Sequence, residues 1–216
     1  MRKKYQLPAV AEIKNVRIDL ERLQSECDKF ADKYVDVRTA NPHLCMNHEE
    51  LIKHVYDNFH QINLTELDGD PLPYTDNVKE RIRRKEEELY NKPTEDFLGS
   101  YFKEITDQFK ADKMRVRITK LEPGKDIDWH IDYDPTYATR IIVPIYTNEK
   151  VRNKFRVRKE ELDTHLEAGK AYFLNTGFAH AVINKSSEPR IALMFSLNGQ
   201  EDIDHLTLED NLDSAI

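Results

Sequence analysis

A short segment with the sequence DWHIDYD, residues 128–134, combines one histidine with three carboxylates. Side chains alternate between the two faces of a strand, so His130 and Asp132 would point the same way if this segment is extended. An imidazole and a carboxylate on one inner face are two potential ligands of a metal ion. An isolated H-x-D pair also arises by chance and then makes an ordinary surface hydrogen bond, so its meaning depends on the rest of the chain.

A second histidine, His180, begins the segment HAVINKS 50 residues after His130. This separation leaves room for about four strands, enough for the chain to return to the same end of a small barrel. Two histidines and one carboxylate with open coordination positions form the facial triad of non-haem Fe(II) oxygenases. Zinc could take the same ligands, but a closed structural zinc site usually has four protein ligands, and neither Cys27 nor Cys45 is near in sequence.

Arg190 and Arg140 each begin a predicted strand, ten residues after one of the two histidines. By alternation, Arg190 shares a face with Ala192 and Met194, which are apolar. A guanidinium on such a face is costly to bury without a partner, and the carboxylate of an anionic co-substrate would supply one. The alternative for each arginine is a strand-end residue whose charge reaches solvent.

These residues lie after position 112, where polarity alternates with a period of two and turn signals separate short segments. Seven or eight short strands without a helical pattern between them predict an antiparallel sandwich or barrel. The expected strands cover residues 114–121, 127–134, 139–147, 154–158, 170–176, 180–186 and 190–197.

Before residue 112, apolar residues recur at helical spacing. Asn47 and Glu50 resemble a capping box, and Glu80 with Arg84 is an i,i+4 ion pair on a segment so charged that it predicts a solvent-exposed helix. The predicted helices cover residues 13–30, 48–59, 78–90 and 97–109.

The combination of motifs resembles a known superfamily. A Pro123-Gly124 turn, H-x-D, an inward arginine, the pattern L-N-x-x-x-x-H-x-V-x-N over 174–184 and the arginine after the second histidine are similar to Fe(II)/2-oxoglutarate-dependent dioxygenases. The most similar pattern is that of the aspartyl/asparaginyl β-hydroxylase-like family, which includes bacterial free-proline hydroxylases. The resemblance implies a double-stranded β-helix (a cupin-like jelly roll) over 112–200. The helical spacing before it predicts an N-terminal helical region over 1–111 that packs on this core, and the acidic residues 201–216 predict a loosely docked or frayed tail.

The resemblance also implies roles for single residues. His130, Asp132 and His180 resemble the iron ligands, Arg190 the partner of the distal carboxylate of 2-oxoglutarate, and Arg140 the basic residue near its C1 carboxylate. Because animal peptidyl aspartyl hydroxylases lack the carboxylate ligand, Asp132 favours the bacterial, proline-hydroxylase-like branch. The implied activity uses Fe(II), 2-oxoglutarate and O₂ to hydroxylate an amino acid or an amino-acid side chain in a peptide, and releases succinate and CO₂.

Weaker signals concern the surroundings of the site. Asp134 and Tyr137 follow the H-x-D motif in a loop at the predicted barrel mouth, where substrate contacts are common. Asn175 and Asn184 could orient metal ligands, or could simply form turns at strand ends. The basic residues of KVRNKFRVRK (150–159) predict a solvent-facing, charge-protected edge strand, or a stripe that attracts an acidic partner.

Composition limits the remaining possibilities. With 216 residues, a net charge of −7 and 34% charged residues, the chain suits one soluble domain and disfavours nucleic-acid binding, including demethylation of nucleic acids. No apolar run predicts a membrane span or signal peptide, and two cysteines give no disulfide framework, so we expect a cytoplasmic protein with Cys27 in its core. Two rivals remain: a cupin-like Zn or Mn enzyme without 2-oxoglutarate, and a non-catalytic β-sandwich that binds proteins.

Overall fold

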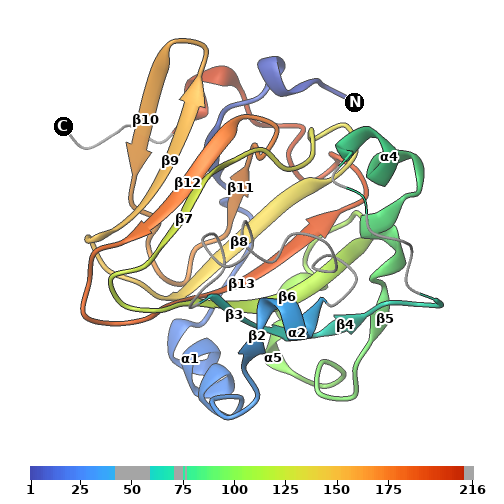
Figure 1. Cartoon of the computed structure of the whole chain (residues 1–216), viewed down its shortest axis with the longest axis vertical. Helices are drawn as coiled ribbons and strands as arrows, with labels where there is room; N and C mark the ends of the chain where they lie inside the picture. Colours follow the sequence, from blue (N-terminus) through green and yellow to red (C-terminus); the bar gives the residue numbers. More distant parts are fainter. Residues whose placement is uncertain (42–58, 71–74, 76, 212–216) are drawn as a thin grey trace.

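The computed structural model describes residues 1–41, 59–70, 75 and 77–211, and its centre is a pair of packed antiparallel sheets (Figure 1). The larger sheet contains β6 (Lys113–Leu121), β8 (Thr139–Tyr146), β11 (Tyr172–Leu174) and β13 (Arg190–Leu197). The smaller sheet contains β7 (Asp126–His130), β9 (Val151–Val157), β10 (Glu160–Thr164) and β12 (Ala179–Asn184).

The strand order identifies the fold. The larger sheet runs β11-β8-β13-β6 and the smaller sheet runs β10-β9-β12-β7, so the chain crosses from one sheet to the other after every strand except at the β9–β10 hairpin. This alternation is that of a double-stranded β-helix, and the predicted jelly roll is confirmed. The eight strands fall within residues 113–197, and β13 has the bounds expected from the sequence.

Strands from the first part of the chain extend the larger sheet on both sides. β1 (Val10–Glu12) pairs with β11, and β3 (Phe59–Asn63) pairs with β6 and with β2 (Val35–Asp36). A further pair, β4 (Thr65–Glu66) and β5 (Lys92–Pro93), lies apart from it. The predicted N-terminal helical region therefore also contains strands, which the sequence analysis did not expect. Strands this short carry little periodicity of their own, and they form because the edges of the jelly roll offer unpaired backbone groups.

The helices are shorter than predicted. α1 (Leu20–Asp28) begins after its N-cap Asp19, not at residue 13, and α5 (Tyr101–Thr106) begins after its N-cap Ser100. The predicted helix over 78–90 is divided into α4 (Val78–Arg83) and the 3₁₀ turn η3 (Glu86–Leu89). The remaining short helices in the described part of the chain are η1 (Lys4–Gln6), α2 (Val37–Ala40) and η4 (Leu208–Asp210).

Part of one predicted helix is not described. The predicted helix over 48–59 and its capping residues Asn47 and Glu50, like Cys45, lie outside the described residues, except for Phe59, which begins β3. Among the described residues, no helix has both the length and the apolar character needed to cross a membrane.

Both faces of the larger sheet are buried. On its outer face, Ile141 and Phe195 pack in one core with residues of α1 and α5, which include Cys27 as predicted. On its inner face, Ile142 and Ala192 pack against Phe155 of β9 in the smaller sheet. Side chains on the inner face, whether apolar or charged, therefore lie inside the jelly roll.

The segment after β13 is packed against the domain. Ile203 and Leu206 are buried, and Asp202 accepts hydrogen bonds from the backbone N–H groups of Lys110 and Ala111 at 2.9–3.1 Å. The prediction of a loosely docked tail is thus wrong as far as Leu206, because apolar residues spaced between the acidic ones cover the outer core.

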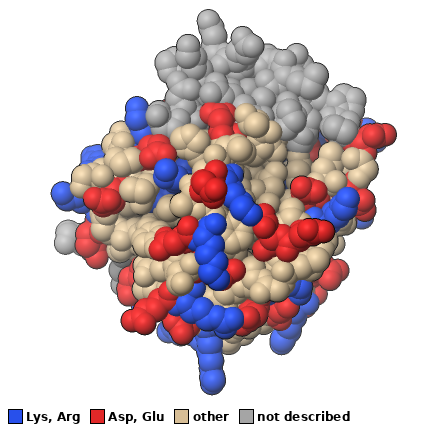
Figure 2. Space-filling view, turned by 90° about the horizontal axis from the view of Figure 1, so that it is seen from below, with Lys and Arg blue, Asp and Glu red and all other residues tan. Residues whose placement is uncertain are grey.

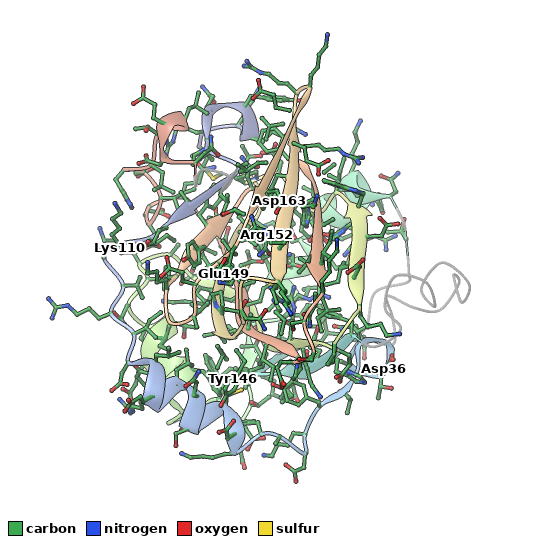
Figure 3. The ribbon with its side chains drawn as sticks, turned by 90° about the vertical axis from the view of Figure 1, so that its left-hand side faces the viewer. Asp36, Lys110, Tyr146, Glu149, Arg152 and Asp163 are labelled. Atoms are coloured by element: carbon green, nitrogen blue, oxygen red, sulfur yellow. The ribbon has the colours of Figure 1, made fainter. Side chains whose placement is uncertain are left out.

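The basic stripe on β9 is neutralised by the neighbouring strand. Arg152 pairs with Asp163 of β10 at 2.7 Å (Figure 3). Lys154 pairs with Glu161, also on β10, at 2.8 Å. β9 lies between β10 and β12 and is not an edge strand. This pairing favours an ordinary solvated surface over a basic stripe that attracts an acidic partner. On the face of the molecule shown in Figure 2, acidic and basic side chains are also interspersed.

Candidate metal centre

Two histidines and one aspartate converge at one end of the smaller sheet. His130 is the last residue of β7 and lies directly opposite His180 of β12 in the ladder. One ligand atom from each of these histidines and one from Asp132 all lie within 4.8 Å of one another. The structure therefore brings together the three residues that the sequence analysis selected as metal ligands.

Asp132 is held differently from the way strand alternation predicts. β7 ends at His130, so the aspartate lies in the following loop. Its backbone N–H donates to the carbonyl of Thr176 at 3.0 Å, and the hydroxyl of Thr176 donates to the carbonyl of Tyr133 at 3.1 Å. The loop before β12 thus fixes the loop after β7, and this contact brings the carboxylate back to the histidines.

Both histidines are oriented by backbone carbonyls. Nδ1 of His130 lies 2.7 Å from the carbonyl of Asp128, and Nδ1 of His180 lies 3.0 Å from that of Phe178. A carbonyl only accepts, so each Nδ1 carries the proton and each Nε2 keeps a lone pair for a metal ion. Burial, together with nearby His130, lowers the pKa of His180 to about 4, so this ring is neutral near pH 7.

The carboxylate is ionised under the same conditions. Burial alone would raise the pKa of Asp132, but His130, Arg140 and His180 hold that pKa well below its usual range. The Asp132 side chain is 37% exposed, so the site is open to solvent on one side. Two imidazoles with Nδ1 held by a backbone carbonyl and one ionised carboxylate, with open positions, suit a divalent transition metal. The residues present therefore fit the ion that the resemblance implies.

Beside this triad lies a buried cluster of charges that the sequence analysis missed. Glu87 of η3 is 1% exposed and pairs with Arg115 at 2.6 Å. Nη2 of Arg140 lies 3.8 Å from Glu87 and 3.7 Å from Asp132. Arg117, opposite Met194 in the ladder, is also buried, and its Nη1 donates to the carbonyl of Arg115 at 2.9 Å.

A bulge in β6 produces this cluster. Arg115 has φ of +50°, and the pairing of β6 with β13 skips one residue there, so its side chain turns toward η3. Burial lowers the pKa of Arg117, and Arg140 and Arg115 lower it further, because the described cluster has more guanidinium groups than carboxylates. The sequence did carry one signal for buried arginines in β6. Arg115 and Arg117 alternate there with Val116 and Ile118, and both neighbours of β6 in the sheet are strands, β13 and β3.

Arg190 enters the space between the sheets from the opposite wall to His180. It shares the inner face of β13 with Ala192, is 3% exposed, and its Nη1 donates to the hydroxyl of Thr119 at 3.3 Å. Burial lowers its pKa to about 10. No carboxylate among the described residues forms an ion pair with it, so its partner is expected to be a ligand.

The predicted loop residues have structural partners. Asp134 accepts hydrogen bonds from the backbone N–H and hydroxyl of Thr136, which makes it a turn residue. The hydroxyl of Tyr137 accepts from the N–H of Glu87 at 3.0 Å, and its ring packs edge-on against Tyr133. A direct contact of either with a substrate stays a prediction.

The two asparagines also bind backbone. The Asn175 amide donates to the carbonyls of Lys4 and Pro8, and that of Asn184 to those of Leu121, Glu122 and Glu188. Asn175 thus ties the loop before β12 to the N-terminal segment, and Asn184 ties the end of β12 to the end of β6. Asn184 also makes a turn contact, because its Oδ1 accepts from the backbone N–H of Ser186. The suggested role in orienting metal ligands stays a prediction, and for Asn175 it could act only through the loop that holds Asp132.

Comparisons with known proteins were made at the level of sequence and of structure. Residues 96–199 match the family model described as aspartyl/asparaginyl beta-hydroxylase. A search of curated proteins gave no match. An oxidoreductase of the 2OG-Fe(II) oxygenase family from Burkholderia pseudomallei is 13% identical with a TM-score of 0.40, covering 65% of this chain and 69% of its own.

A cupin domain from Bordetella pertussis is 20% identical with a TM-score of 0.32, covering 43% of this chain and 88% of its own. Because these TM-scores are low, the fold assignment rests on the strand order of the chain itself. The similarity to a family rests on the sequence match, which contains the metal triad, Arg140 and Arg190. Over residues 96–199 the chain is therefore similar to the aspartyl/asparaginyl β-hydroxylase family, and this similarity supports the enzyme class expected from the sequence.

Proposed function

We propose that this protein is an Fe(II)- and 2-oxoglutarate-dependent dioxygenase that hydroxylates an amino acid or an amino-acid side chain in a peptide. The convergence of His130, Asp132 and His180 within 4.8 Å carries the proposal. The buried Arg190, without a carboxylate partner in the described part of the chain, supports a carboxylate-bearing co-substrate.

Each group has a defined task in this reaction. When bound, Fe(II) with 2-oxoglutarate and O₂ supplies the oxidising chemistry, with succinate and CO₂ as co-products. The Nδ1–H groups of both histidines stay on backbone carbonyls and keep Nε2 directed at the metal. Arg190 and the hydroxyl of Thr119 bind the distal carboxylate, and Phe155 with the inner core excludes water behind His180.

The arginine cluster supports a substrate that carries a carboxylate, as an amino acid does. Three buried donors, Arg115 Nε, Arg140 Nη1 and the Tyr133 hydroxyl, have no hydrogen-bond partner among the described residues. Unpaired donors beside surplus positive charge are suited to an anion. Arg140 and Arg117 are our candidates for binding the substrate carboxylate or the C1 carboxylate of 2-oxoglutarate.

The decisive experiment is an anaerobic titration of metal-free protein with Fe(II) and then with 2-oxoglutarate, followed by visible absorption. We expect a metal-to-ligand charge-transfer band in the wild type. We expect no band in His130→Ala, and a band in Arg190→Ala only at far higher 2-oxoglutarate. Arg152→Ala, which removes a surface arginine paired with Asp163, is the matched control and should behave as the wild type.

Absence of the band at saturating 2-oxoglutarate would exclude the oxygenase. Tight binding of Zn(II) or Mn(II) without any effect of Arg190→Ala would then favour a cupin-like metalloenzyme. Loss of all metal binding would favour a protein-binding module. With the band present, release of succinate in the presence of amino acids or peptides identifies the substrate.

A further inference from the structure

Glu87 lies outside the family match, in the first part of the chain, and yet reaches the interior of the jelly roll. Its carboxylate accepts hydrogen bonds from Arg115 at 2.6 Å and from the hydroxyl of Ser196 at 2.8 Å. Its backbone N–H donates to Tyr137. One residue of η3 thus contacts β6, β13 and the loop after β7.

The same carboxylate shares a cation with the candidate metal ligand. Nη2 of Arg140 lies 3.8 Å from Oε2 of Glu87 and 3.7 Å from Oδ2 of Asp132. Both separations are longer than a hydrogen bond, so the guanidinium is balanced between two carboxylates by charge attraction. The side chain of Arg140 is 4% exposed, and water screens these attractions little.

This balance has a consequence for metal binding. A guanidinium paired with Asp132 alone would compete with a metal ion for the charge of that carboxylate. Glu87 offers the same Nη2 of Arg140 a second anion. It also offsets Arg115, a further cation near Asp132.

We propose that Glu87 is a positioning residue that holds Arg140 off Asp132 and so keeps the aspartate available to the metal ion. This inference rests on the proposed metal site. The sequence analysis predicted a solvent-exposed helix over 78–90. The inference gives this segment a role in metal binding by residues 96–199, which match the family model. The opposing possibility is that Glu87 only anchors η3 to the barrel.

The test compares the Fe(II) affinity of folded variants, measured anaerobically by competition with a chelator. Replacing a residue that orients a metal ligand without binding the metal itself typically weakens metal affinity by about 10–100-fold. We therefore expect Glu87→Gln to weaken Fe(II) binding about tenfold or more. Ser196→Ala, which removes one hydrogen bond to Glu87 and no charge, should weaken it less and in the same direction.

Two controls separate positioning from anchoring. Glu80→Gln alters a carboxylate of α4 that pairs with Arg83 at 2.7 Å and with Arg84 at 2.8 Å, and should leave the Fe(II) affinity unchanged. In an Arg140→Met background, Glu87→Gln should have a much smaller effect on that affinity, because the shared cation is gone and only the compensation of Arg115 is lost. An anchoring role predicts the same effect with and without Arg140.

The outcomes are distinguishable from failure of the proposed function. If the wild type does not bind Fe(II), the metal site itself is wrong. If the wild type binds Fe(II) and folded Glu87→Gln and Ser196→Ala bind it equally well, the positioning role is overturned and the metal site stands. If Glu87→Gln does not fold, Ser196→Ala decides, and wild-type affinity in that variant overturns the role.

Discussion

Arg190 lies where an anionic ligand could bind, and the burial of its charge there lowers the stability of the protein without that ligand. Its guanidinium is buried, and a hydroxyl is its single hydrogen-bond partner in the described part of the chain. Burying a cation without a counter-ion lowers stability, because the lost hydration is not replaced. A site that waits for an anionic ligand is expected to show this combination.

Replacing Arg190 by methionine, which has a similar shape without the charge, should therefore separate stability from binding. We expect the free energy of unfolding of the metal-free protein to stay unchanged or rise by about 1 kcal/mol. The dissociation constant of 2-oxoglutarate should rise about 100-fold, since two charged hydrogen bonds of roughly 1.5 kcal/mol each are lost. Urea unfolding and ligand titration of the same sample measure both. A loss of several kcal/mol with unchanged binding would make Arg190 a structural residue.

Glu87 should contribute to stability in a pH-dependent way. Burial would raise its pKa, but Arg115, Arg140 and Arg117 hold it at about 2, below the ordinary value of 4.5. As the pH falls, the unfolded chain takes up the proton first. The stabilisation is therefore complete above about pH 4.5 and is lost between about pH 4.5 and 2, with a full value of roughly 3 kcal/mol.

The comparison of wild type with Glu87→Gln measures this term. The difference in free energy of unfolding between the two proteins should be largest near pH 7 and should shrink between about pH 4.5 and 2. Glu80→Gln is the control, because Glu80 also pairs with two arginines but is only partly buried, so that water screens the pairs and the pH-dependent difference should be smaller. A difference that does not depend on pH would mean that Glu87 is not ionised in the folded protein.

Among the elements, those with regular alternation were predictable from sequence and those defined by their neighbours were not. Strands β6, β8 and β13 begin and end within a residue of their predicted positions, because alternating or continuous apolar runs between turn signals define them. The polar sequence EELDT gave no signal for β10, an edge strand that forms by hairpin pairing with β9. β1 and β3 likewise form because a sheet edge is present.

The residues of the site likewise differ in whether the sequence could predict them. The spacing of the histidines and Asp132 is visible in sequence, although Asp132 reaches the site through a loop contact with Thr176 and not through strand alternation. The burial of Glu87 depends on arginines from β6 and β8, which only the folded topology brings beside η3. The many charges of residues 78–90 predicted a solvent-exposed helix, but Glu86 and Glu87 in η3 are buried.

The junction between α4 and η3 carries local strain that a substitution can relieve. Lys85 has φ of +56° and ψ of +40°, a left-handed conformation at the end of a helix where glycine is favoured. We expect Lys85→Gly to raise the free energy of unfolding by about 1 kcal/mol. Its ion pair with Glu88, 3.3 Å long and exposed on the lysine side, contributes little.

Lys85→Ala is the matched control, because it loses the same ion pair and keeps the strained backbone. It should give no increase in stability. If alanine and glycine have the same effect in urea unfolding, the left-handed conformation does not limit the stability of the segment that carries Glu87.

At the scale of the whole molecule, the candidate metal ligands come from elements that are held together mainly by the smaller sheet. His130 ends β7, His180 lies in β12, and Asp132 lies in the loop after β7. β7 is the edge strand of that sheet, with β12 as its neighbour. A metal ion bound at the triad would join these elements, so metal binding should be visible as stability of the entire fold.

A ligand that binds only the folded state stabilises it by about 2.7 kcal/mol at 100 times its dissociation constant. For a chain of this size, each kcal/mol raises the melting temperature by roughly 2–4 °C, so Fe(II) or Mn(II) should raise it by roughly 5–10 °C. His130→Ala should lose this increase. His165→Ala should keep it, since His165 also has Nδ1 beside a carbonyl, that of Val151 at 3.1 Å, but is not part of the triad. An equal metal-dependent increase in both variants would place the ion elsewhere in the protein.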